Sequence, residues 1–139
     1  MYTEQQYEEF SKRMEATYPK MFANPYGGFA VSMGWWPILE SLCANIQSHI
    51  DWRVKQNLDI AQVEVNQIKE KFGGLRFYYS GGDDEISGMV RMAESWASVA
   101  CEECGAFGKR RSDGWIRTLC DHHEEERQEQ MKKRFNNET

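Results

Sequence analysis

Two short pairs of metal-binding side chains constrain the fold of this 139-residue chain more than any other feature. Cys101 and Cys104 form a Cys-x2-Cys pair, and a spacer of 15 residues separates it from a Cys-x2-His pair, Cys120 and His123. Structural zinc sites take four such ligands in a tetrahedron, and the two-residue gap lets one turn bring both side chains of a pair to one ion. The sequence therefore predicts a structural Zn²⁺ site.

The imidazole ligand has two candidates, because His122 precedes His123 directly. Cys120 to His123 repeats the spacing of the first pair, and residues three apart share a helix face, which favours His123. His122 remains the alternative. Free thiols or a disulfide are the competing states of the cysteines, but a disulfide needs an oxidising compartment, and nothing in the sequence indicates export.

Length and composition favour a single domain, or a domain with a small appended module. The chain is 40% hydrophobic and 13% aromatic, which is enough for a core. The first residues lack a basic and then apolar signal pattern, and no apolar run reaches the ~18 residues of a membrane span, so we expect a cytoplasmic protein. The net charge of −5 argues against broad nonspecific binding to nucleic acid but leaves a local basic patch open.

Helical periodicity appears in four segments. A helix is predicted over residues 3–17 with a capping box at Thr3, and another runs from Pro37 to about Gln56 with an apolar face that includes Cys43, which we interpret as core packing. A third helix starts at the acidic residues Asp83–Glu85 and leads directly into Cys101. A fourth begins at Asp121.

Residues 62–80 have the alternating pattern of two strands, joined by a turn over residues 71–74. Ile68 falls on the opposite parity from Val63 and Val65, which predicts either a bulge near Gln67 or a partly covered outer face. Because an isolated hairpin is marginal in water, we expect a third strand, with Phe29–Met33 as the best candidate.

The knuckle at residues 101–105, the spacer hairpin and the helix after Cys120 resemble treble-clef modules. The predicted fold is α+β: a small antiparallel sheet containing a β-hairpin, packed by amphipathic helices, with a docked treble-clef-like zinc module. We expect an α+β body over residues 1–100 and a zinc module over residues 101–139. No Pro-, Ser- or Gly-rich linker separates the two, so the module is expected to be integral with the body.

Two groups of basic and aromatic residues are candidate binding surfaces, each with solvent exposure alone as the competing interpretation. The first lies in the zinc spacer, where cations beside an aromatic ring can contact phosphates and stack a base. It comprises Lys109, Arg110, Arg111, Trp115 and Arg117. The second lies on the outer face of the predicted hairpin and would suit an anionic small molecule or an acidic protein. It comprises Lys69, Lys71, Arg76 and Tyr78.

No catalytic constellation emerges from the sequence. His49 has no paired nucleophile, helix-start chemistry explains Asp83–Glu85, and the glycine pairs do not match phosphate-binding loops. Four protein ligands would also leave the zinc ion without an open position for water. We therefore expect a protein that is not an enzyme, although an enzyme with an unrecognised site is a third, weaker interpretation.

A resemblance to a known group covers residues 35–123. The string Ile68–Tyr79, the knuckle Cys101–Gly105, Gly114–Ile116 and Thr118–Cys120 resemble small uncharacterised proteins of bacteriophages and prophages. The resemblance implies a setting, the bacterial cytoplasm during infection, where small acidic proteins often block host defence systems by binding. It implies no activity and no residue roles.

The leading functional hypothesis is therefore a zinc-stabilised, non-enzymatic binding protein of phage type. Its expected partner is a host protein or a small anionic signalling ligand. The alternative is a nucleic-acid-binding regulator that uses the zinc hairpin.

Overall fold

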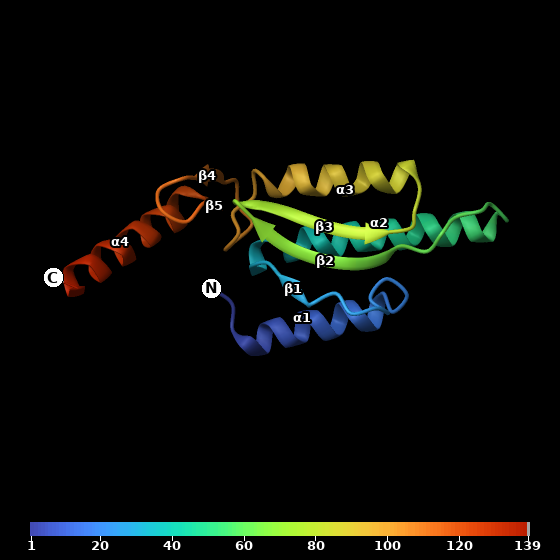
Figure 1. The fold of residues 1–139 in the computed structure, drawn as a ribbon, viewed down its shortest axis with the longest axis horizontal. Coiled ribbons are helices and arrows are strands. Elements are labelled where there is room, and N and C mark those ends of the chain that lie inside the picture. The colour runs from blue at the N-terminus through green and yellow to red at the C-terminus, as the bar shows by residue number, and fades with distance from the viewer. Residues whose placement is uncertain (139) are drawn as a thin grey trace.

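The computed structural model describes residues 1–138, so residue 139 of the predicted zinc module lies outside the described part. A two-layer body of sheet and helices carries a small hairpin-and-helix module at one end (Figure 1). In chain order the elements are α1 (Glu4–Thr17), β1 (Phe29–Ala30), the 3-10 helix η1 (Met33–Trp35), α2 (Trp36–Lys55), β2 (Glu64–Lys71), β3 (Gly74–Ser80), α3 (Asp84–Ala97), β4 (Lys109–Arg111), β5 (Arg117–Leu119) and α4 (Asp121–Glu138). The predicted α+β class is confirmed.

The main sheet has the order β1-β2-β3. Strands β2 and β3 form the predicted antiparallel hairpin, whereas β1 runs parallel to β2 with Phe29 opposite Ile68. The sheet is therefore mixed rather than purely antiparallel. The third strand begins at Phe29 as predicted but ends at Ala30, because the chain turns into η1, where the amide of Trp35 donates to the carbonyl of Ser32.

A bulge in β2 resolves the parity conflict in the sequence. The register shifts between Val65 and Gln67, and both Val65 and Ile68 are fully buried. The extra residue restores the apolar side chains to one face of the strand. The first of the two expected alternatives is confirmed.

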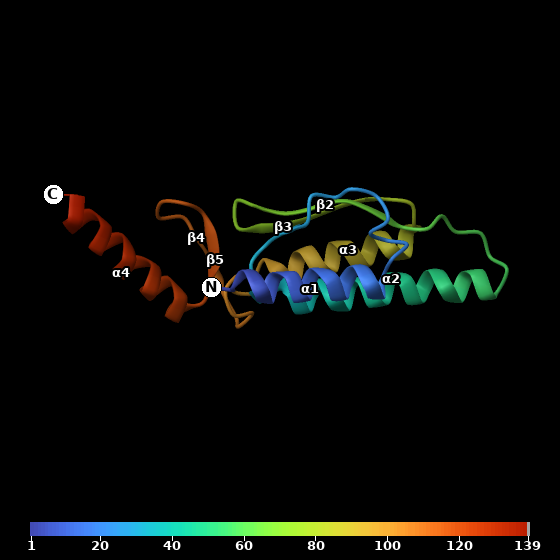
Figure 2. The same ribbon diagram turned by 90° about the horizontal axis from the view of Figure 1, so that it is seen from below.

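Helices α1, α2 and α3 lie on one side of the sheet, as the view from below shows (Figure 2). The core between the layers is rich in aromatic rings: Phe10 stacks on Trp36 with centroids 4.6 Å apart and meets Phe29 edge-on at 4.9 Å. Cys43 is completely buried, and burial raises its thiol pKa to about 12. Its interpretation as core packing is confirmed, as is the capping box between Thr3 and Gln6.

The segment that begins at Ala100 contacts the rest of the body at η1. The amide of Gly34 donates to the carbonyl of Glu102 at 2.8 Å, and Trp35 Nε1 donates to the carbonyl of Ala100 at 2.9 Å. A Cβ atom at Gly34 would lie 2.1 Å from the carbonyl oxygen of Cys101, so glycine is required for this approach. Helix α4 projects away from the body in both views (Figures 1 and 2). No helix within residues 1–138 is long and apolar enough to cross a membrane.

Candidate metal centre

Three separate elements supply the four predicted metal ligands. Cys101 and Cys104 lie in a knuckle closed by a hydrogen bond from the amide of Gly105 to the carbonyl of Cys101, with Gly105 at φ +80°. Cys120 follows β5, and His123 lies in the first turn of α4. The ligand atoms of these four residues lie within 4.8 Å of one another. Residues far apart in the sequence thus form one candidate metal site.

The distances between the ligand atoms match the edges of a small tetrahedron. A zinc ion with three thiolates and one imidazole has S···S edges of about 3.8 Å and S···N edges of about 3.6 Å. The Sγ atoms of Cys104 and Cys120 are 3.8 Å apart, and Nδ1 of His123 lies 3.6 Å from Sγ of Cys101 and 3.2 Å from Sγ of Cys120. The residues present therefore fit a tetrahedrally coordinated ion.

His123, and not its neighbour, completes this site. Its Nδ1 atom faces the sulfurs, while its Nε2 atom lies 4.0 Å from the carboxylate of Glu126, beyond hydrogen-bond distance. His122 is exposed and pairs with Glu126 at 3.1 Å. The spacing argument that favoured His123 agrees with this geometry.

The thiols would repel one another as thiolates without a cation. Desolvation and the neighbouring thiols of Cys101 and Cys120 raise the pKa of Cys104 to about 11. At Cys101 burial also acts to raise the pKa, but hydrogen bonds from backbone amides, including those of Cys120 and Cys104, lower it overall. Because only thiolates bind metals, an ion at the centre is the species that would stabilise all three together.

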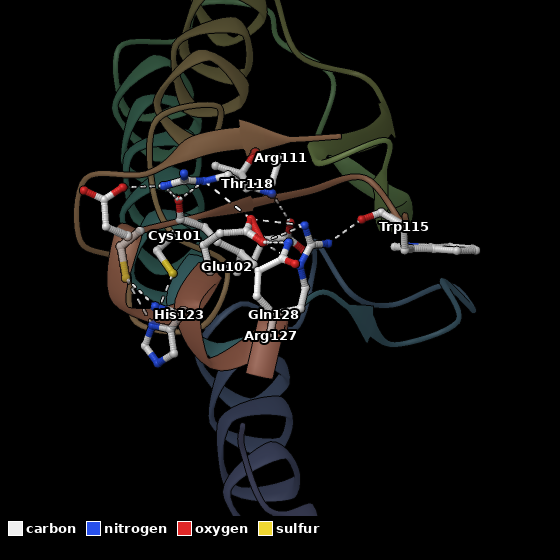
Figure 3. Close-up of polar contacts among 12 residues, drawn as sticks. Cys101, Glu102, Arg111, Trp115, Thr118, His123, Arg127 and Gln128 are labelled. Carbon is white, nitrogen blue, oxygen red and sulfur yellow. Dashed lines mark hydrogen bonds and ion pairs between the residues drawn. The ribbon is translucent and has the colours of Figure 1, made fainter. Parts of the chain in front are cut away.

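A network of buried carboxylates and arginines supports the knuckle and the hairpin (Figure 3). Burial raises the pKa of Glu102 to about 6, and its carboxylate accepts the amide of Thr118 at 2.7 Å and lies 3.7 Å from Arg117. Arg117 also bonds Glu103 at 2.7 Å, and Arg111 bonds the Leu119 carbonyl and Asp121. Two of the predicted binding residues, Arg111 and Arg117, are thus engaged in contacts within the module.

The other predicted surface residues are free of ion pairs. Within the described chain, Lys109 and Arg110 have no carboxylate within 4.0 Å, and Trp115 is 78% exposed. The hairpin set shares one face of the β2–β3 ladder: Lys69 lies opposite Arg76, and Lys69 Nζ lies 5.9 Å from the ring centroid of Tyr78.

Sequence reasoning missed Phe72, which lies in the β2–β3 turn and is 61% exposed. Phe72 and Trp115 line the same cavity of about 320 Å³, together with Lys71. The two predicted surfaces therefore adjoin at this cavity. The sequence feature that could have identified Phe72 is its place before a glycine pair in a predicted hairpin turn.

A groove between α2 and α3 was also missed. It has a volume of about 360 Å³, and no charged residue lines it. Met92 and Trp96 of α3 are 68% and 56% exposed at this groove. The apolar stripe that helical spacing predicts for α3 includes Trp96, so this stripe is wider than the surface that the body covers.

His49 has a partner that the sequence did not reveal. Its Nε2 atom bonds Asp83 at 2.8 Å and its Nδ1 atom lies 2.6 Å from Glu85, while the other oxygen of Asp83 accepts the amide of Ile86 as the N-cap of α3. The interpretation of Asp83–Glu85 as helix-start chemistry is confirmed. The imidazole joins the end of α2 to the start of α3.

Comparisons with protein-family models, with curated proteins and with solved structures find no match to this chain.

Proposed function

We propose that this chain is a non-enzymatic binding protein in which a structural Zn²⁺ ion fixes the C-terminal module and a cationic surface engages an anionic partner. The cationic face, as we name it, consists of Lys69, Lys71, Arg76 and Arg110. Because Arg110 lies in β4, between the two ligand pairs, the module forms part of this surface.

Zinc is the metal that the donor set supports best. Three thiolates and one imidazole in a tetrahedral arrangement are typical of Zn²⁺ sites, and harder cations prefer oxygen ligands. Four protein ligands leave no open position for a catalytic water, so the ion's role would be to stabilise the fold. The contacts of Gly34, Trp35 and Glu102 at the module boundary support the same role.

The observation that carries the binding proposal is a cross-strand pair of like charges. Lys69 and Arg76 lie directly opposite each other on the β2–β3 ladder, where like charges repel. Among the described residues, no carboxylate lies within 4.0 Å of any cation of the cationic face. In a chain with net charge −5, this local excess of positive charge favours an external anionic partner.

The setting follows from the sequence resemblance to phage and prophage proteins. In an infected bacterial cell, a small protein of this kind would act by occupying its anionic partner, in the manner of anti-defence or host-takeover proteins. An acidic host protein, a small anionic ligand and a nucleic acid all present the complementary charge.

Charge reversal on the cationic face tests the proposal. The full zinc-loaded chain should be retained on heparin, a polyanion probe, at low salt, and Lys69→Glu with Arg76→Glu should abolish retention. The matched control is Lys12→Glu with Lys20→Glu, two exposed lysines at α1 and the turn after it, which should reduce retention only slightly. Equal losses in the two double variants would show that retention reflects net charge, and no retention of the wild-type chain would refute the proposal.

A further inference from the structure

Two exposed aromatic side chains from different parts of the chain line one cavity. Phe72 comes from the β2–β3 turn and Trp115 from the loop between β4 and β5, and the wall between them includes Lys71 and Ile116. Figure 3 shows the indole of Trp115 projecting away from the polar network of the module. A cavity of about 320 Å³ between two rings has the dimensions and chemistry to take a planar aromatic group.

The backbone at Phe72 is unfavourable for a phenylalanine. Phe72 has φ +53° and Gly73 has φ +78°, so both turn residues are left-handed, as in a type I′ hairpin turn. Asn, Asp or Gly normally occupies the first of these positions, since a bulky side chain there is strained. The exposed ring gains little from burial in return. Strain of this kind without a packing benefit points to a role in binding.

Contacts with α4 hold the backbone of Trp115, while its ring is exposed. Arg127 of α4 donates to the carbonyl of Trp115 at 2.5 Å, and a Cβ atom at Gly114 would lie 3.6 Å from Met131 of α4. Helix α4, which the metal ligand His123 anchors, thus fixes this loop. The backbone that carries the indole is therefore held in place.

Lys71 lines the cavity, and further cations follow along the sheet. Lys71 Nζ lies 5.8 Å from the ring centroid of Phe72. Arg110 is the cross-strand partner of Thr118, whose hydroxyl bonds Gly73, so Arg110 shares the hairpin face that is turned toward the β2–β3 turn. Beyond the cavity, Lys69 and Arg76 lead to Tyr78, which is 43% exposed.

We propose that this surface binds single-stranded nucleic acid, with one base between Phe72 and Trp115 and phosphates along the cationic face. The inference rests on the proposed function of that face and names the partner's class. Aromatic rings interleaved with cations are the recognition chemistry of single strands, whereas a base-paired duplex keeps its bases stacked inside. Glu70 in the cavity wall accepts the amide of Gly73 and can also accept an amino group of a base.

The row of cations distinguishes a strand from a mononucleotide. A mononucleotide would use the cavity with Lys71 or Arg110 and leave Lys69, Arg76 and Tyr78 without contacts. An acidic protein would use the cations but has no need of an exposed aromatic ring in a strained turn. The combination of both features favours a polymer that carries bases and phosphates together.

Fluorescence anisotropy of labelled 12-nucleotide oligonucleotides, titrated with the full zinc-loaded chain over a range of salt concentrations, tests the inference. Phe72→Asn, which suits the turn, and Trp115→Ala should each weaken binding by about tenfold, in line with the loss of one base-stacking contact. Phe107→Ala removes another exposed ring of the same module, 72% exposed, and should change binding by less than twofold. Heparin, which carries no bases, should bind both cavity variants as tightly as the wild-type chain.

The outcomes separate this inference from the function on which it rests. If heparin binds through the cationic face but Phe72→Asn and Trp115→Ala bind oligonucleotides like the wild-type chain, the base site is refuted and the anion-binding function stands. Binding of a mononucleotide, a duplex or poly-glutamate as tightly as the 12-nucleotide strand would also overturn the inference. If neither heparin nor any oligonucleotide binds, the proposed function itself is wrong.

Discussion

The hydroxyl of Thr118 on β5 donates a buried 2.7 Å hydrogen bond to the carbonyl oxygen of Gly73 in the β2–β3 turn. A Cβ atom at Gly73 would lie 3.2 Å from this hydroxyl, so the turn and the β4–β5 hairpin are in close contact. This contact brings Phe72 and Trp115 to the same cavity. The candidate metal site is therefore connected to the cavity through Thr118 of β5 as well as through α4.

Thr118→Val should destabilise the protein by about 1–3 kcal/mol, because valine has the same shape but leaves the Gly73 carbonyl buried without a donor. Urea denaturation measures the change. The matched control is Thr17→Val, since the Thr17 hydroxyl bonds the Arg13 carbonyl at an exposed helix end and should contribute about 0.5 kcal/mol or less. Equal losses of stability at the two positions would contradict the contribution of the buried hydrogen bond between Thr118 and Gly73.

Replacement of a metal ligand should release the whole C-terminal module. Cys104→Ser is expected to lose the metal and to unfold at least the last 40 or so residues, since a structural zinc ion contributes folding energy directly. Hydrogen exchange should show that the backbone amides of β4, β5 and α4 lose their protection. The amides of α2 should keep theirs for longer. Cys43→Ala removes a cysteine that is not a ligand and should retain the metal and the protection of α4. Wild-type protection of α4 in Cys104→Ser would refute a structural role.

Phe72→Asn should stabilise the protein by about 1 kcal/mol, because asparagine tolerates the left-handed backbone that penalises phenylalanine. Thermal or urea denaturation measures this gain. Phe107→Asn serves as the control, since Phe107 is similarly exposed and has no positive φ. A loss of stability in Phe72→Asn would mean that the ring packs usefully in the free protein.

Acid should weaken the contact between α2 and α3. The hydrogen bond with His49 is the main cause that lowers the pKa of Asp83 below its ordinary value of 3.8. A carboxyl group whose pKa is lower in the folded than in the unfolded state adds to the free energy of unfolding at pH values above its unfolded pKa. This contribution disappears as the pH falls through the folded-state pKa. The wild-type chain should therefore be more stable than Asp83→Asn at pH 6, and the difference should shrink below about pH 4.

Urea denaturation at several pH values checks this dependence. Asparagine still caps a helix, so the comparison isolates the charge of Asp83, which acts on His49 and on Arg53. Protonation of the metal ligands at low pH acts on both proteins alike and cancels in the difference. A difference that stays constant between pH 3 and pH 6 would contradict the role of Asp83.

The sequence predicted those features that depend on local spacing. The two ligand pairs, the apolar face around Cys43 and the cap at Asp83 each lie within a few residues, where periodicity and side-chain chemistry are decisive. The bulge near Gln67 was accessible for the same reason, since Ile68 breaks the two-residue alternation.

Features that depend on docking between distant segments were not predictable. The parallel pairing of Phe29 with Ile68 joins segments almost 40 residues apart, and a two-residue strand leaves no periodic signal. Composition alone could not separate Arg111 and Arg117, which bond the module itself, from Arg110, which has no carboxylate within 4.0 Å among the described residues. The exposure of Trp96 likewise depends on how much of α3 the body covers.

Native mass spectrometry of the full chain tests the central claim, that one structural metal ion fixes the module beside the cationic face. The account predicts a folded species with the mass of one chain plus one zinc ion, and a shift to unfolded, highly charged species when a chelator removes the ion. A folded, compact chain that carries no metal, before or after the chelator, would contradict it.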